Sequence, residues 1–230
     1  MVLKILKTVW PVMLTYVAIG TPCGMIMAQA GMEPWMVFAL SSTFVTGCGQ
    51  FMVCNLWLAG VPAASIVASV AAISSRFALY SASIAPHLAG ASKRQTLAVA
   101  ATLTEEAYGI SLAKLIEGQD WGPRESFALN VILIATWGVS CTTGAVVGAV
   151  VDVSTALASF VCTSLFICLL FSQRLSRGNA VAAVLAAASV AVCKFLGWTN
   201  VAVPVSVLVG VAAALVCDAL AEGRGARDAR

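Results

Sequence analysis

Long apolar stretches, separated by short polar or glycine- and proline-containing turns, run through the whole chain. No charged side chain occurs from Thr8 to Met32, from Pro34 to Ser75, or from Phe77 to Ser92. About 20 apolar residues of helix are needed to cross the hydrocarbon core of a bilayer. The pattern predicts an all-α polytopic transmembrane bundle of seven or eight spans in one integral-membrane domain, residues 1–230. The expected spans lie near residues 9–30, 35–58, 62–86, 127–151, 153–171, 180–196 and 201–220, and 95–115 is ambiguous.

Composition supports the membrane class. Hydrophobic residues make up 60% of the chain and charged residues 10%, whereas soluble domains carry about 25% charged residues. Apolar runs that continue for about 20 residues also differ from the alternating ten-residue segments of a membrane β-barrel. The net charge of +3 and its scattered distribution give no sign of nucleic-acid binding. The eight cysteines lie in apolar stretches without a C-x-x-C pair, which favours packing over metal binding or disulfides.

The first span contains the sequence I-G-T-P-C-G-M at residues 19–25. Two glycines around a proline can interrupt a membrane helix, and the freed backbone groups must then line protein or a cavity. Broken helices of this kind often form transporter binding sites. We therefore expect the first span to be broken at Gly20–Gly24, with Gly20, Pro22 and Gly24 as candidate site residues. An ordinary proline kink is the alternative.

Polar side chains recur in the next two spans. Thr43, Thr46 and Gln50 follow helical spacing and predict one polar face. Arg76 lies inside a membrane-length run, with Tyr80 one turn later on the same face. A guanidinium inside a bilayer costs roughly 2.5–3.5 kcal/mol or more, so it usually faces a bundle interior or a partner. The alternative is that Arg76 reaches an interface from a shorter helix.

The segment from Gln95 to Leu115 is ambiguous because Glu105 and Glu106 interrupt its apolar run. A fully crossing helix would bury at least one carboxyl group, and burial favours the neutral form of such a group. A half-span or re-entrant segment would leave both groups wetter. We assign Glu106 as a candidate carrier of a coupling proton.

Lysine and arginine placement gives partial information on orientation. With eight spans and a cytoplasmic N-terminus, nine of the thirteen basic residues lie inside the cell. With seven spans and an outside N-terminus the count is again nine, because Lys4 and Lys7 exchange with Lys93 and Arg94. Both arrangements place the short charged tail, residues 222–230, in the cytoplasm.

Together the polar features suit a small zwitterion. Arg76 or free backbone amides could meet its carboxylate, and a glutamate could meet its ammonium group. The chain lacks H-E-x-x-H, G-x-S-x-G and Walker-type patterns, so we expect neither an enzyme nor a cofactor, metal or ATP requirement. The only histidine, His87, is expected at an interface. A membrane assembly or regulatory subunit without transport activity, or an exporter of another small amphiphilic molecule, are the alternatives.

Five stretches carry a resemblance to a known family, in the same order from about residue 10 to residue 172. They are I-G-T-P-C-G-M at 19–25, G-Q-F at 49–51, R-F-A-L-Y-S-A-S-I-A-P-H at 76–87, L-T-E-E-A-Y at 103–108 and W-G-V-S-C-T-T-G-A-V-V-G at 137–148. The chain resembles the AzlC family, the azaleucine-resistance family of large subunits of branched-chain amino acid exporters. The last stretch adds Trp137 to the candidate site residues.

The resemblance implies a multi-pass permease of the bacterial inner membrane. It implies export of valine, leucine and isoleucine, and of methionine or toxic analogues in some members, by proton antiport. It also implies a small membrane partner of the AzlD type. The protons, the amino acid substrate, the small subunit and the lipid bilayer are thus the expected partners.

Overall fold

The structure is a computed structural model that describes residues 1–88, 90–118, 121–150 and 177–198, with further positions at 160, 163, 164, 167, 202, 205–210, 212, 213, 216 and 217. The chain forms two compact units. Unit 1 comprises Met1–Asn55 and Ser74–Cys162, and unit 2 comprises Leu56–Ile73 and Thr163–Arg230. The span expected at 153–171 falls mostly outside the described residues, and the tail at 222–230 falls entirely outside them.

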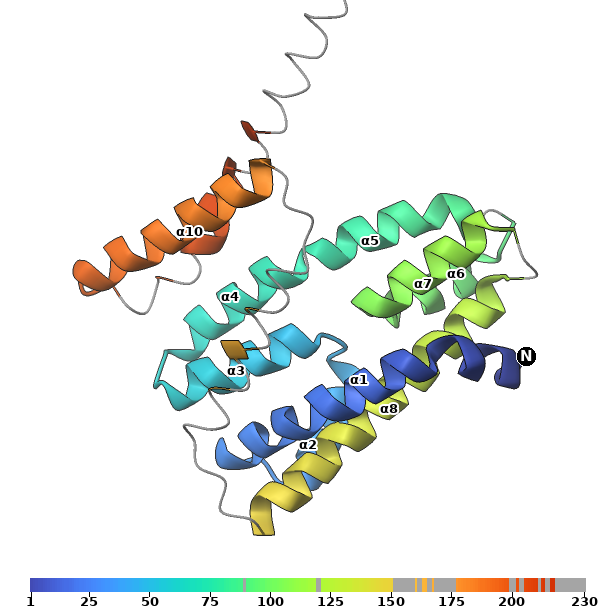
Figure 1. Cartoon of the computed structure of the whole chain (residues 1–230), viewed down its shortest axis with the longest axis horizontal. Coiled ribbons are helices and arrows are strands. Elements are labelled where there is room, and N and C mark those ends of the chain that lie inside the picture. Colours follow the sequence, from blue (N-terminus) through green and yellow to red (C-terminus); the bar gives the residue numbers. More distant parts are fainter. Residues whose placement is uncertain are drawn as a thin grey trace, which may run out of the picture. The chain divides into compact units, whose positions relative to one another are not determined.

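Every regular element of the described residues is a helix, which confirms the predicted all-α class (Figure 1). The elements are α1 (Val2–Gln29), α2 (Pro34–Thr43), α3 (Gly47–Leu58), α4 (Ala63–Ser74), α5 (Arg76–Ile84), the 3₁₀ helix η1 (Ala85–Leu88), α6 (Lys93–Ala101), α7 (Glu105–Ile116), α8 (Pro123–Val150) and α10 (Arg177–Phe195).

Among the described residues, three helical stretches are long and apolar enough to cross a membrane: Val2–Gln29, Ala63–Leu88 and Pro123–Val150. A helix of 28 residues, such as α1 or α8, is about 42 Å long, which exceeds the roughly 30 Å of a bilayer core. The protein is therefore a membrane protein built on long apolar helices. Shorter elements occupy the remaining predicted spans of unit 1.

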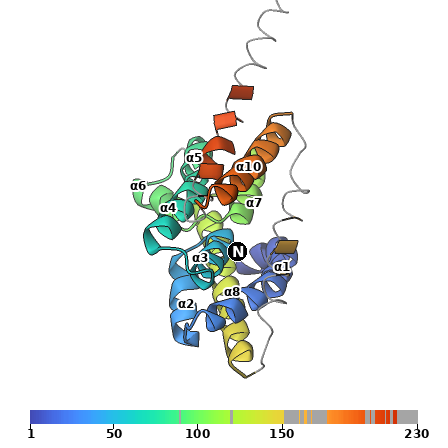
Figure 2. The same cartoon turned by 90° about the vertical axis from the view of Figure 1, so that its left-hand side faces the viewer.

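Helices α1 and α8 lie side by side in unit 1, and α2 packs on α8 (Figure 2). A Cβ atom at Gly24 would overlap the carbonyl oxygen of Cys141, and one at Gly144 would overlap that of Thr21. Small residues allow membrane helices to approach backbone to backbone, where dispersion contacts replace the absent hydrophobic driving force. The glycine pair in α8, Gly144 and Gly148, thus packs against α1 within the chain.

The expected break of the first span at Gly20–Gly24 is wrong, because α1 is one continuous helix through this region. Pro22 lacks a backbone N–H, so it removes only one hydrogen bond of the helical ladder. The glycines have a packing role instead. A Cβ atom at Gly20 would stand 2.8 Å from that of Ser140, and Gly24 makes the backbone contact with α8.

The break lies in the second predicted span, between the end of α2 at Thr43 and the start of α3 at Gly47. The side-chain oxygen of Gln50 lies 3.2 Å from Ser41 Oγ, although nine residues of continuous helix would advance about 13.5 Å. The chain therefore reverses direction here. Thr46 caps the new helix by accepting a hydrogen bond from the Gly49 amide at 3.2 Å.

The ambiguous segment also forms two short helices, α6 and α7, separated by residues 102–104. Ser92 and Gln95 form a reciprocal capping box at the start of α6, and Thr104 caps α7 by accepting from the Ala107 amide at 3.1 Å. An apolar cluster of Ile84, Leu88, Val99 and Leu103 joins α5, η1 and α6. Neither helix alone is long enough to cross a bilayer.

Unit 2 contains α4 and α10. A Cβ atom at Gly210 would lie 3.4 Å from that of Ala186 in α10, so the helical residues 205–210 pack on α10 through small side chains. These helical residues fall within the apolar stretches expected at 180–196 and 201–220, of which 201–220 lies partly outside the described residues.

Candidate functional site

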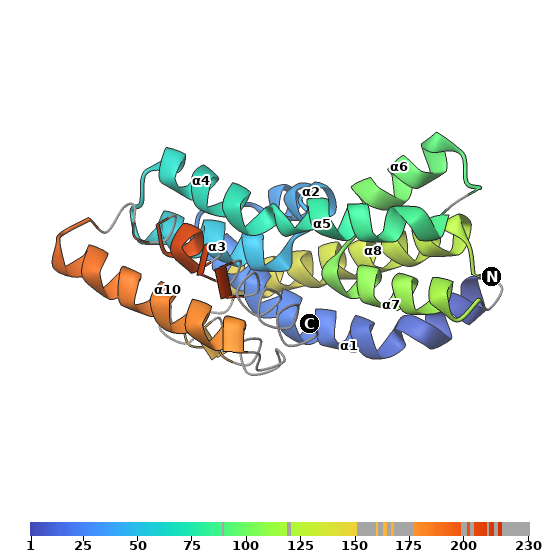
Figure 3. The same cartoon turned by 90° about the horizontal axis from the view of Figure 1, so that it is seen from above.

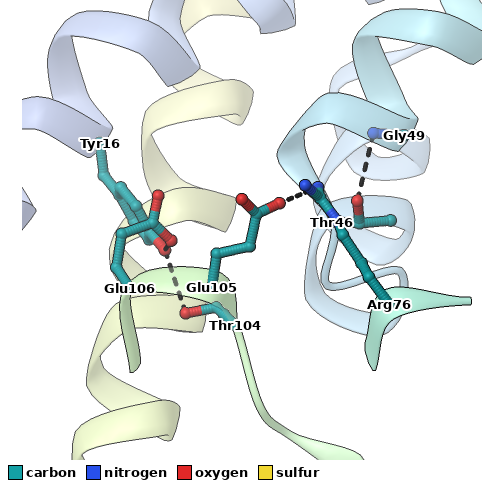
Figure 4. A network of polar contacts seen from close by, with 7 residues as sticks. All are labelled: Tyr16, Thr46, Gly49, Arg76, Thr104, Glu105 and Glu106. Carbon is teal, nitrogen blue, oxygen red and sulfur yellow. Dashed lines mark hydrogen bonds and ion pairs between the residues drawn. The ribbon is translucent and has the colours of Figure 1, made fainter. Parts of the chain in front are cut away.

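Two adjacent carboxylates, Glu105 and Glu106, occupy the first turn of α7 (Figure 4). Their backbone position follows from the Thr104 cap, which ends the break and starts the helix. The N-terminus of a helix carries a partial positive charge that stabilises nearby anions. The fold therefore places both carboxylates where a helix end favours negative charge, and Figure 4 shows them pointing to different partners.

Glu105 forms an ion pair with Arg76, the first residue of α5. Each of the two side chains is 30% exposed. Nε of Arg76 is buried without a hydrogen-bond partner in the part of the chain that the structure describes. The Arg76 guanidinium also lies 5.7 Å from the ring centre of Phe77, at cation–π range. Arg76 is thus paired within unit 1 and retains one buried donor.

Glu106 accepts a hydrogen bond of 2.6 Å from the hydroxyl of Tyr16 in α1. The same hydroxyl lies 3.2 Å from Thr104 Oγ1, and Tyr16 is only 6% exposed. Tyr16 was not among the site residues predicted from the sequence. Its signal was its position one turn before Gly20 and two before Gly24, on the helix face that packs against α8.

Gln50 and Trp137 form the neutral part of the site. The Gln50 side-chain oxygen accepts hydrogen bonds from Trp137 Nε1 at 3.0 Å and from Ser41 Oγ at 3.2 Å, and its amide donates to the Phe44 carbonyl. The Tyr16 ring meets the Trp137 ring edge to face, with centroids 5.3 Å apart. Tyr16 therefore connects the carboxylates of α7 to the buried amide of α3.

Other predicted site residues lie elsewhere. Tyr80 stacks on Tyr108 with ring centroids 4.6 Å apart, in an aromatic cluster between α5 and α7. Gly20, Pro22 and Gly24 belong to the continuous α1 helix and supply no unwound backbone. The predicted face of Thr43, Thr46 and Gln50 is also wrong, because the break separates them and Thr43 donates to the Ala39 carbonyl.

The charges of this cluster do not balance within the described residues. The cluster contains one guanidinium and two carboxylates, and its remaining contacts come from neutral hydroxyl, amide and indole groups. A site with one surplus negative charge in a membrane protein is stabilised by a cation or a proton. The cluster therefore holds one carboxylate that no described cation neutralises.

Comparison with known proteins identifies the family of the chain. A family model described as AzlC protein matches residues 11–151. This range includes Tyr16, Gln50, Arg76, both glutamates and Trp137. No match was found among curated proteins or among solved structures. Because the matched range covers more than half of the 230 residues, the chain belongs to the AzlC family, whose members are membrane proteins associated with transport.

Proposed function

We propose that this chain is the large subunit of a secondary exporter of branched-chain amino acids in the bacterial inner membrane, driven by proton antiport. The observation that carries the proposal is the Arg76–Glu105 ion pair beside a second carboxylate, Glu106. These groups lie within a unit that contains membrane-length apolar helices. Such ionisable clusters in membrane proteins mark substrate or ion pathways.

An amino acid zwitterion matches the ion pair in charge. Its carboxylate can take the place of Glu105 on Arg76, and its ammonium group can take the place of Arg76 on Glu105. One internal pair is then replaced by two pairs with the substrate, so no net charge is moved into the site. The buried, unpartnered Nε of Arg76 adds a donor for a carboxylate held by two parallel hydrogen bonds.

Glu106 is the proposed proton carrier. Its described partner is the neutral hydroxyl of Tyr16 rather than a cation, so the surplus negative charge of the cluster resides there. A proton that binds Glu106 neutralises this charge without disturbing the Arg76–Glu105 pair. Proton binding and substrate binding can therefore alternate at neighbouring carboxylates.

The small AzlD-type partner enters as part of the proposal. Its support is the family and the large apolar side chains on the outer faces of α1 and α8, among them Trp10, Leu14, Val139 and Val146. These side chains suit lipid or another membrane subunit. The transport experiment therefore includes the small subunit.

The test is efflux of preloaded labelled valine, with leucine and methionine in parallel, from cells that make this chain and its small partner. An imposed pH gradient supplies the driving force. Arg76→Gln and Glu106→Gln are compared with wild type. Glu117→Gln is the matched control, because Glu117 lies on the solvent side of the end of α7 and pairs with Lys114.

We expect efflux in wild type and in Glu117→Gln, and its loss in the other two variants at equal amounts in the membrane. Unchanged efflux in Arg76→Gln and Glu106→Gln would make those residues structural. If no tested amino acid leaves wild-type cells faster than empty cells, the substrate assignment is wrong.

A further inference from the structure

Helix α6 begins, and helix α7 ends, at the same end of unit 1 (Figure 3). A cleft of about 450 Å³ is lined by Gln95 at the start of α6 and by Leu115 at the end of α7. The same cleft is lined by residues of η1, including His87, and by the start of α8, including Trp121 and Arg124. The break at 102–104 therefore forms the far tip of a helical hairpin.

The hairpin is too short to cross a bilayer. α6 has nine residues and α7 has twelve, which correspond to about 14 and 18 Å. Each helix reaches roughly halfway through a hydrocarbon core of about 30 Å. Non-helical backbone is tolerated at that depth only where protein or a cavity surrounds it. Contacts of the tip with Tyr16 and Arg76 supply such surroundings.

Basic residues gather at the base of the hairpin. Lys4 lies over the Trp121 ring at 6.0 Å, so the N-terminus of α1 belongs to this end as well. Six basic residues of the described chain lie in the first two turns of α1, the first turns of α6 and α8 and the last turn of α7: Lys4, Lys7, Lys93, Arg94, Lys114 and Arg124. The opposite end of unit 1, in its described part, carries Glu33 and no lysine or arginine.

We infer that residues 93–116 form a re-entrant hairpin that enters from the cytoplasm and returns to it, and that the N-terminus is cytoplasmic. The inference rests on the excess of lysine and arginine that cytoplasmic loops carry, and it does not depend on the substrate. It places Glu105 and Glu106 at a tip inside the membrane, with their supporting helices rooted on the cytoplasmic side.

This topology also places more of the chain's lysines and arginines on the cytoplasmic side than either arrangement expected from the sequence. After α8 leaves the cytoplasm, the three crossings predicted beyond residue 152 return the C-terminal tail to it. Arg174, Arg177 and the three arginines of the tail then join the six basic residues at the hairpin base. Eleven of the thirteen lysines and arginines become cytoplasmic, compared with nine in either arrangement expected from the sequence.

The contacts that hold the tip share one helical turn. Arg76–Glu105 and Tyr16–Glu106 both end on the first turn of α7. A displacement of the hairpin would therefore break both contacts together.

The test is the accessibility of single introduced cysteines to a membrane-impermeant maleimide, in intact cells and after the membrane is opened. His87→Cys precedes the hairpin, Glu117→Cys follows it and Glu33→Cys marks the opposite end; all three positions are exposed. The parent chain, with its native cysteines, gives the background. Arg94→Cys and Ile116→Cys replace the first two variants if either fails to accumulate.

We expect Glu33→Cys to react in intact cells, and His87→Cys and Glu117→Cys to react several-fold above the parent chain only in opened cells. Labelling of positions 87 and 117 from opposite sides would show that the segment crosses the membrane. Labelling of both from outside would overturn the orientation. Neither result would bear on whether valine is exported, so this inference and the proposed function fail separately.

Discussion

The two broken segments of unit 1, α2–α3 and α6–α7, restart their second helix in the same way. Thr46 accepts a hydrogen bond from the amide three residues later, and so does Thr104. The first turn after Thr46 holds glycines and Gln50, whereas the first turn after Thr104 holds two glutamates. The same capping arrangement therefore occurs at the α2–α3 break, called here the neutral break, and at the α6–α7 break, called the charged break.

The polar side chain at the neutral break is completely buried, whereas the two carboxylates at the charged break are not. Gln50 has no exposed surface and its oxygen accepts from two described donors. Glu105 is 30% exposed and Glu106 is exposed. Neutral hydrogen-bonding groups can be satisfied inside a protein, whereas buried charges need counter-ions or water. The α2–α3 break is therefore suited to a fixed structural role, and the α6–α7 break to a change of state.

The largest expected effect follows from removing the cation of the charged break. In Arg76→Gln, Glu105 loses its counter-ion; breaking a buried pair costs roughly 3–5 kcal/mol, and less here because both side chains are partly exposed. We expect a lower thermal midpoint in detergent together with loss of efflux. The double variant Arg76→Gln/Glu105→Gln should recover most of the stability without recovering efflux. A double variant as unstable as Arg76→Gln would contradict the pairing.

A smaller effect is expected when the neutral break is altered. Gln50→Leu leaves the indole of Trp137, the hydroxyl of Ser41 and the Phe44 carbonyl without their partner, which costs roughly 1–3 kcal/mol. The thermal midpoint should fall, and Trp137 fluorescence should shift. Gln50→Glu is the matched control, since it keeps an acceptor for both donors and places a carboxylate at the neutral break. Equal stability of wild type and Gln50→Leu would show that this network is dispensable.

Tyr16→Phe removes a single oxygen atom and with it the hydrogen-bonded link between the charged break and the neutral break. The ring contact with Trp137 remains, whereas the hydrogen bond to Glu106 disappears. Because Glu106 is exposed, the loss should cost less than the roughly 1.5–3 kcal/mol of a hydrogen bond to a charged group. Efflux should therefore fall with only a small drop in the thermal midpoint. The neighbouring Tyr108→Phe variant, which loses only its bond to Ser83, is the control. Similar efflux in both variants would argue against a special role for Tyr16.

The smallest effects concern the two caps. Thr46→Ala and Thr104→Ala each remove an N-cap, at about 1 kcal/mol. Thr104→Ala should be the more harmful of the two, because Thr104 also contacts the Tyr16 hydroxyl. Thermal midpoints and efflux measured side by side, with Thr→Ser variants that keep the hydroxyl, test this order. A greater loss in Thr46→Ala would reverse the roles assigned to the two breaks.

Hydropathy and charge were sufficient to predict the class of protein and part of its polar centre. A guanidinium and two carboxylates within apolar runs are costly wherever they lie in the membrane, so Arg76, Glu105 and Glu106 could be singled out from the sequence. The pairing of Arg76 with Glu105, 29 residues later, depends on how α5 and α7 pack. The cost of burying each charge by itself does not predict that packing.

The broken helix was predicted in the wrong span because glycine in a membrane helix can either permit unwinding or allow a second helix to approach closely. Gly20 and Gly24 could permit unwinding or close packing, and only the partner helix decides between them. The actual break followed a local rule that was visible in the sequence, a threonine with glycines in the next turn. Tyr16 was missed because a phenol in an apolar run has no charge to draw attention to it.

The backbone contact between Gly24 and Cys141 has a consequence for the synthesis of the protein. About 90 residues separate α1 from α8, and translation at about 5–20 residues per second takes roughly 5–18 s to make them. During that interval the glycine face of α1 is in the membrane before its partner exists. Lipid or the insertion machinery must hold α1 as a single helix until the ribosome delivers α8.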